Sequence, residues 1–208
     1  MKVEYFFASY SAFAYIGNEE LHRIASRHNL EIRYVPFDLR ATLPAAGATP
    51  MPERSQAHKD YFFGREISRT AEYRGLEILD FIPTHHANDI TLSNCLLIAA
   101  DQSGADMRKL TNVMMHAHWA KDADLDDEQT LLDICAEADL DGMALMETAR
   151  TADVLAQYEK NTKEAIERSV FGSPTYFLDG DMFYGQDRLE MMERAIEKPY
   201  KGRWPIRG

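Results

Sequence analysis

The pattern of apolar and polar positions near the N-terminus predicts two strands joined by a helix. A β-branched and aromatic run over 3–8 ("VEYFFA") is typical of a buried strand. Apolar residues at helical spacing between Phe13 and Ala25 predict a helix that ends near Asn29, and "LEIRYVPF" (30–37) predicts a second strand. Because a β-α-β crossover normally brings its strands together in the same direction, we expect the two strands to be parallel.

The C-terminal end of the chain predicts a hairpin followed by a helix. Two short apolar runs, 175–178 and 182–184, flank a turn through Asp179 and Gly180. An Asp-Gly pair between apolar runs favours a tight turn in which both residues have positive φ. Helical spacing over about 186–198 follows, so the chain is expected to end in the order β-β-α.

The segment between these two ends is predicted to be mostly helical. Pro, Ala and Gly dominate 40–51, which favours a loop. Helical periodicity covers 53–170, with breaks near 75–89, at Gly104, around "KDADLDDE" and at Gly142. The predicted order is therefore β-α-β, a helical block of roughly 120 residues, and β-β-α.

The composition is that of a globular protein, and the negative net charge argues against a nucleic-acid partner. Of the 208 residues, 45% are hydrophobic and 27% are charged, as in ordinary folded domains. The net charge of −11 would repel phosphates, so we expect no nucleic-acid partner. No apolar run approaches the roughly 18 residues of a membrane span, and the start lacks a signal-peptide pattern. We therefore expect no membrane partner and a cytoplasmic location.

The two cysteines argue against self-contained dithiol chemistry. Cys95 and Cys135 lie far apart in helix-like segments, and neither belongs to a CxxC motif. A structural disulfide between them is disfavoured in a reducing compartment, so we expect two buried free thiols.

The histidines do not form a recognisable metal motif. The "HH" pair at 85–86 points its side chains two ways on any element. The "HAH" at 116–118 has no accompanying carboxylate motif. We therefore expect no metal site.

Two motifs resemble those of a known family. The first, "FFASYSAFAYIG" (6–17), joins the first strand to the helix, and the second, "VFGSPTYFLDGDMFYGQDRLEMME" (170–193), contains the predicted hairpin. Both are similar to segments of the 2-hydroxychromene-2-carboxylate isomerases and of the related kappa-class glutathione transferases, with the better fit to the isomerases. Ala12 and Phe13 depart from the Pro and Tyr usual in these proteins. The Gly-Asn pair that these proteins have in a later loop is replaced here, around 47–49.

The resemblance implies an α/β fold of the thioredoxin-like class with a large inserted all-helical domain, as in DsbA-like proteins. It implies a discontinuous thioredoxin-like domain formed by 1–40 and 170–208. Residues 41–169 would then be the linker and the helical insertion. The order of elements predicted from periodicity is the same as in this fold.

Ser11 is the candidate catalytic residue. Without the resemblance, Ser9 or Ser11 is simply an N-cap of the first helix. A helix N-terminus also lowers the pKa of a thiol held there, and a serine hydroxyl can donate to the resulting thiolate. Ser11 itself is a poor nucleophile without a neighbouring His. The resemblance implies that Ser11 stabilises the thiolate of bound glutathione, the cofactor that supplies the missing sulfur.

The resemblance implies further residues that bind glutathione. Pro174 would follow a cis peptide bond, and the backbone of Ser173 would pair with the cysteinyl unit. Backbone N–H groups of Gln186 and Asp187 would bind the γ-glutamyl carboxylate, the Asp187 side chain its ammonium group, and Lys59 the glycyl carboxylate. Plain structural alternatives exist: "DRLE" is typical of a capping box with Asp187 as N-cap, and Lys59 is typical of a solvated helix face.

The function implied by the resemblance is a glutathione-dependent isomerase acting on a small aromatic molecule. It would interconvert 2-hydroxychromene-2-carboxylate and trans-o-hydroxybenzylidenepyruvate, a step of aromatic catabolism, by reversible thiolate addition. Two alternatives remain: a kappa-like glutathione transferase or peroxidase, which would consume glutathione, and a non-catalytic DsbA-like binding protein. The family also implies a homodimer.

Overall fold

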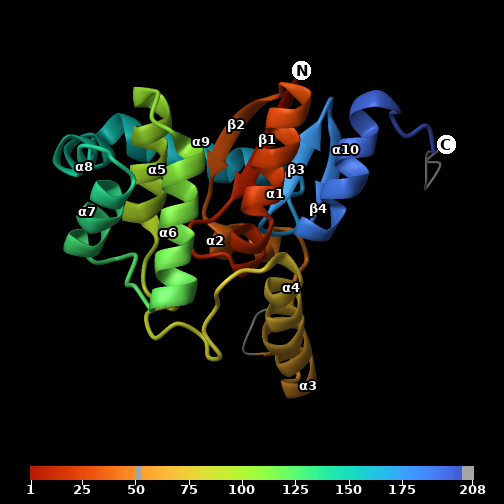
Figure 1. The fold of residues 1–208 in the computed structure, drawn as a ribbon, viewed down its shortest axis with the longest axis horizontal. Helices are drawn as coiled ribbons and strands as arrows, with labels where there is room; N and C mark the ends of the chain where they lie inside the picture. Colours follow the sequence, from red (N-terminus) through yellow and green to blue (C-terminus); the bar gives the residue numbers. More distant parts are fainter. Residues whose placement is uncertain (50–52, 203–208) are drawn as a thin grey trace.

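A computed structural model describes residues 1–49 and 53–202 as a mixed four-stranded sheet with helices around it (Figure 1). The strand order is β2-β1-β3-β4, with β1 parallel to β2 and β3 antiparallel to both β1 and β4, as the predicted order requires. The elements are β1 (Lys2–Phe7), α1 (Ala12–His28), β2 (Glu31–Pro36), α2 (Leu39–Ala45), α3 (Gln56–Lys59), the π-helix η2 (Asp60–Arg65), α4 (Glu66–Arg74), α5 (Thr91–Ser103), α6 (Met107–Lys121), α7 (Glu128–Glu137), α8 (Gly142–Ala149), α9 (Ala152–Glu167), β3 (Thr175–Leu178), β4 (Asp181–Tyr184), the 3-10 helix η3 (Gln186–Arg188) and α10 (Leu189–Glu197).

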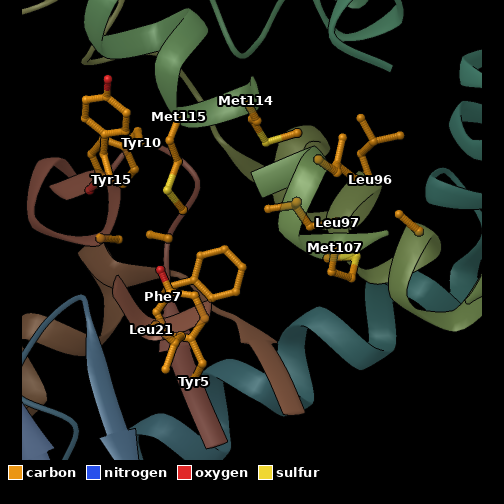
Figure 2. Close-up of a cluster of buried hydrophobic side chains, with 14 of the residues drawn as sticks. Tyr5, Phe7, Tyr10, Tyr15, Leu21, Leu96, Leu97, Met107, Met114 and Met115 are labelled. Carbon is orange, nitrogen blue, oxygen red and sulfur yellow. The ribbon is translucent and has the colours of Figure 1, made fainter. Parts of the chain in front are cut away.

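Side chains of β1 alternate between two hydrophobic cores on opposite faces of the sheet. Tyr5 and Phe7 belong to the larger core, which includes residues of α1, α5, α6 and α10, whereas Phe6 packs in a smaller core with residues of α9. Figure 2 shows Met115 of α6 pointing toward the part of the larger core that contains Tyr10. Because this core is continuous from the sheet into the helical block, the division into two domains stays a prediction.

A ring of four charged side chains connects α9 to the edge of the smaller core. The Arg33 guanidinium donates to the carboxylates of Glu4 and Glu164, and the Arg168 guanidinium donates to the same two carboxylates. Arg168 also lies over the Phe177 ring, at 3.7 Å from its centroid. Hydrogen bonds from the two arginines lower the pKa of both carboxyl groups.

The predicted turns are confirmed by backbone geometry. Asn29 ends α1 in the left-handed conformation, with φ of 49°. Asp179 and Gly180 both have positive φ, 50° and 83°, in the hairpin between β3 and β4. These positions show that local turn chemistry decided the ends of α1 and of the hairpin.

The predicted loop over 40–51 is wrong for its first half, because α2 occupies Leu39–Ala45. The Asp38 carboxylate caps this helix by accepting the Ala41 N–H at 3.0 Å. Pro44 lies in the last turn, where it costs a short helix only one backbone hydrogen bond. The Asp38 N-cap therefore favours a helix here despite the Pro and Gly content of the segment. Positions 50–52 of the predicted loop lie outside the described residues.

The cysteines are buried and free, as predicted. Burial raises the pKa of the Cys95 and Cys135 thiols to about 11, so neither is a ready thiolate at neutral pH. Of the helices described in residues 1–49 and 53–202, none is long and apolar enough to cross a membrane.

Candidate functional site

The turn between β1 and α1 places Ser11 at the N-terminus of the helix. Ser11 Oγ accepts the Ala14 N–H at 3.3 Å, and the side chain is only 7% exposed. Ser9, the alternative cap, is instead hydrogen-bonded through Oγ to the Ser93 hydroxyl at 2.9 Å. The N-cap interpretation is therefore confirmed for Ser11, while Ser9 fastens the turn to α5.

Two hydrogen bonds join this turn to the loop before β3. The Ser11 hydroxyl donates to the Ser173 carbonyl oxygen at 3.0 Å, and the Ala8 N–H donates to Ser173 Oγ, also at 3.0 Å. The Ser173–Pro174 peptide bond is cis, as predicted. The fold thus brings three predicted site residues together from opposite ends of the chain.

The first turn of α1 has donors for an anion. Within the described part of the chain, no hydrogen bond reaches the N–H groups of Ala12 and Phe13, which are the orphan donors of a helix start. Together with the helix dipole, such donors favour a negative charge. The proton of Ser11 is directed at Ser173, so a bound thiolate would compete with that carbonyl for the hydroxyl.

The helix η3 places Gln186 and Asp187 beside the cis-proline loop. The Gly185 N–H donates to the Pro174 carbonyl oxygen at 2.9 Å, and Gly185 has a φ of 99°, which favours glycine. Among residues 1–49 and 53–202, no acceptor is hydrogen-bonded to the N–H of Gln186 or Asp187. Two predicted glutathione-binding residues therefore lie next to Pro174 with free backbone donors.

Asp187 is not an N-cap, so the capping-box interpretation was wrong. Arg188 occupies the N-cap position of α10, and no side chain caps either η3 or α10. The Asp187 carboxylate is exposed, pairs with Arg188 at 3.3 Å and lies close to Gly185. The chain enters α10 through a 3-10 turn, which displaces the start of the α-helix beyond Asp187.

Gly17 of α1 allows η3 to approach closely, and sequence reasoning missed it. A Cβ atom added at Gly17 would lie 2.7 Å from Gln186 Cβ and 3.0 Å from the Tyr176 hydroxyl oxygen. Because such contacts are far shorter than ordinary van der Waals distances, only glycine fits here. The signal was an isolated Gly within a helical pattern.

A cavity of about 440 Å³ lies next to this end of the sheet. The Phe62 ring in its wall contacts the ring of Phe13, at 5.0 Å between centroids, and Tyr184 in its wall is paired with Thr175, directly after Pro174. The volume is within the usual range for small-molecule sites. The cavity is lined by Thr49, Glu53, Arg54, Ser55, His58, Phe62 and Tyr184.

Lys59 is at the end of α3 but is not among the residues that line the cavity, whereas Arg54 is. Arg54 Nε donates to the Thr49 carbonyl oxygen at 2.8 Å, and its guanidinium lies over the Phe63 ring. The role predicted for Lys59 stays a prediction. Sequence reasoning missed Arg54 as a site residue, although it lies only five positions before Lys59.

His86 and His118 form a hydrogen-bonded pair beside Tyr10. His118 Nδ1 lies 2.9 Å from the Ala123 carbonyl oxygen and must donate to it, so neutral His118 accepts through Nε2 from His86 Nδ1, at 3.0 Å. Burial is the main cause that lowers the pKa of His86 to about 4. Within the described residues, no group of three or more His, Cys, Asp or Glu side chains is placed to hold a metal ion.

The sheet order, the cis-proline loop and a first turn with serine in place of cysteine define a thioredoxin-fold protein whose own turn carries no redox thiol. A family model described as the DSBA-like thioredoxin domain matches residues 2–197. The chain belongs to that family.

Named relatives and solved structures are similar over nearly the whole chain. The 2-hydroxychromene-2-carboxylate isomerase of Pseudomonas putida is 29% identical over 198 residues, 94% of each chain, and that of Sphingobium xenophagum is 27% identical over 93% of this chain and 97% of its own. A solved 2-hydroxychromene-2-carboxylate isomerase matches with a TM-score of 0.81 and 28% identity over 95% of both chains. A probable DsbA oxidoreductase from Streptomyces coelicolor, at a TM-score of 0.78 and 18% identity over 100% of this chain and 93% of its own, shares the fold. The relatives support isomerase activity.

Proposed function

We propose that the protein is a glutathione-dependent isomerase that interconverts 2-hydroxychromene-2-carboxylate and trans-o-hydroxybenzylidenepyruvate. The observation that carries this proposal is the Ser11 turn, which offers a hydroxyl and two free N–H groups where a thiol is missing. The adjoining cavity is large enough for a small peptide ligand. Relatives of nearly equal length bear the name of this isomerase.

Each part of glutathione has a complementary group at this site. The free N–H groups of Gln186 and Asp187 suit the γ-glutamyl carboxylate, and the exposed Asp187 carboxylate suits its ammonium group. The Ser173 carbonyl oxygen suits the cysteinyl N–H, in exchange for the Ser11 hydroxyl that it now accepts. Ser11 is then released to donate to the sulfur.

The chemistry is a reversible conjugate addition. When bound, glutathione supplies a thiolate nucleophile. Addition of that thiolate to the benzylic carbon would turn the substrate double bond into a single bond, which can rotate, and loss of the thiolate would restore the double bond in the cis form. The phenol oxygen of the cis form would then add to the ketone carbon, and its proton would pass to the ketone oxygen, which closes the hydroxychromene ring. The role of this chain is to hold the sulfur as an anion, through Ser11 and the N-terminus of α1.

The test is to mix the protein with trans-o-hydroxybenzylidenepyruvate and follow its absorbance with and without glutathione. We expect rapid approach to equilibrium with glutathione only, and no loss of free thiol. S-methylglutathione, which binds similarly but has no free thiol, is the control and should not support turnover. An equal rate without any thiol would contradict the proposal.

The same assay separates the two alternatives. Thiol loss in proportion to substrate loss would indicate a transferase. A non-catalytic binding protein would show no acceleration, and one without affinity for glutathione would show no rise in melting temperature. For a true ligand at 100 times its Kd, the stabilisation is about 2.7 kcal/mol.

A further inference from the structure

The flank of the Ser11 turn formed by Tyr10 is built from aromatic rings and one arginine. The Tyr10 carbonyl oxygen accepts the Trp119 indole N–H at 2.9 Å, which fixes the turn to α6. The Tyr10 ring lies 4.8 Å from the His86 ring, and the Arg40 guanidinium carbon lies 5.0 Å from the Tyr10 centroid. Arg40 is therefore held against the side chain of Tyr10, the residue that precedes Ser11 in the sequence.

Arg40 is the cation of this flank, and the carboxylate of Asp89 lies near it without forming an ion pair with it. It donates to the carbonyl oxygens of His86 and Asn88, both at 2.9 Å, which orients the guanidinium, and its side chain is exposed. Within residues 1–49 and 53–202 it forms no ion pair. The acidic groups near it are engaged elsewhere: Asp38 caps α2, and Asp89 accepts from Thr91. An exposed, oriented and unpaired guanidinium in a chain of net charge −11 is a site for an anion.

This flank and the cavity lie on different sides of the turn. Phe13 contacts Phe62 of η2, in the wall of the cavity, whereas Tyr10 contacts Trp119 of α6 and the segment that leads into α5. In Figure 1, α6 stands to one side of β1 and α1, and the continuous helix formed by α3, η2 and α4 extends below them. A peptide ligand in the cavity would leave the Tyr10 flank open to a second molecule that approaches the same sulfur.

We propose that Arg40 binds the carboxylate of the aromatic substrate, with the half-buried ring of His86 beside its aromatic part. This inference rests on the proposed function. In trans-o-hydroxybenzylidenepyruvate only two carbon atoms separate the carbon that the thiolate attacks from the carboxylate carbon. The cation that holds the carboxylate must therefore lie near the sulfur position, and Arg40 is the candidate because its guanidinium lies over the ring of Tyr10, the residue before Ser11. Arginine suits this role because its planar fork matches a carboxylate.

The experiment compares the wild-type protein with Arg40→Met and Arg40→Lys in the isomerase assay. Two competitive inhibitors serve as probes: o-hydroxycinnamate, which carries a carboxylate, and o-hydroxycinnamamide, which is neutral. We expect Arg40→Met to raise the KM for the substrate and the inhibition constant of the carboxylate at least tenfold, and to change that of the amide less than twofold. Arg40→Lys, which keeps the charge without the fork, should fall between.

A matched control is Arg23→Met, which also removes an exposed arginine and should leave both inhibition constants unchanged because Arg23 lies on α1 three turns beyond Ser11 and pairs with Glu20. Equal weakening of the carboxylate and the amide by Arg40→Met would overturn the inference, because Arg40 would then only hold the His86 segment in place. An unchanged KM would overturn it as well. A wild-type protein without isomerase activity would overturn the proposed function, and this inference with it.

Discussion

The hydroxyl of Ser11 has two tasks at the scale of one residue, and a substitution separates them. Ser11→Ala removes an N-cap, which costs about 1 kcal/mol of unfolding free energy, so the protein should remain folded. Turnover with glutathione should fall well beyond tenfold, because the thiolate loses its hydroxyl donor. Steady-state kinetics and urea unfolding measure the two effects.

Ser9→Ala is the matched control for Ser11→Ala. It removes a buried hydrogen bond to Ser93, worth about 1 kcal/mol, from the same turn. Stability should fall by a similar amount, yet turnover should stay within a factor of two. If Ser11→Ala kept wild-type turnover, the role assigned to Ser11 would be wrong.

Asp187 caps no helix, so the glutathione-binding role predicted for its side chain can be tested apart from helix stability. Asp187→Ala should leave the melting temperature nearly unchanged and weaken glutathione binding about tenfold, since a charge-assisted hydrogen bond is worth about 1.5–3 kcal/mol. Isothermal titration calorimetry measures the affinity. Glu190→Ala, three residues further on, is the control. An unchanged affinity in Asp187→Ala would show that the Asp187 side chain does not bind glutathione.

Arg54 and Lys59 are the two candidates for binding the glycyl carboxylate in the proposed glutathione complex. Because Arg54 lines the cavity and Lys59 does not, Arg54→Met should raise the Kd for glutathione by about tenfold, and Lys59→Met by less than threefold. The comparison uses the same titration for both variants. A larger effect at Lys59 would favour the sequence-based prediction over the geometry of the cavity.

At the scale of elements, the site depends on how closely η3 packs against α1. Gly17→Ala should lower the unfolding free energy by about 1–3 kcal/mol, although Ala favours helices, because its Cβ meets Gln186. Glutathione affinity should fall with it, because η3 carries the N–H donors. Calorimetric melting and titration give the two values.

Gly64→Ala in η2 is the control for Gly17→Ala, since a Cβ atom added at Gly64 meets nothing within 4 Å. It should leave stability and affinity close to those of the wild type. A Gly17→Ala protein as stable as the wild type would show that η3 shifts at no cost.

Elements whose ends are set by one strong local signal could be predicted from the sequence. Elements at which two local signals favour different structures could not. The Ser11 cap and the Asp179–Gly180 turn follow from local chemistry, and the structure confirms them. The α2 helix and the start of α10 depend on whether a cap or a 3-10 turn prevails, and both predictions failed. The contact of Arg40 with Tyr10 depends on tertiary packing, which no periodicity encodes.

At the scale of the whole molecule, buried histidines should make stability depend on pH. Burial lowers the pKa of His22 to about 4, below the unfolded value of about 6.5. The unfolded state therefore binds more protons between these values, so the stabilisation is complete above pH 6.5 and is lost as pH falls toward 4. His86 acts in the same direction.

Urea unfolding at pH 7.5 and pH 4.5 measures this effect. His22→Gln should show a smaller loss between the two pH values, by roughly 2 kcal/mol, than the wild type. An identical slope in His22→Gln would mean that His22 titrates normally in the folded protein.

The hydrogen bond from the Ala8 N–H to Ser173 Oγ spans 165 positions of the sequence. During synthesis, β1 is therefore made long before β3, the strand that pairs with it on the side opposite β2. The helices α5 to α9 are synthesised before β3, and they contact one another, α5 with α8 and α6 with α7 among them. Contacts so distant in sequence form late in folding. The turn that carries Ser11 is consequently made long before Ser173, and the site they form together is among the last parts to be completed.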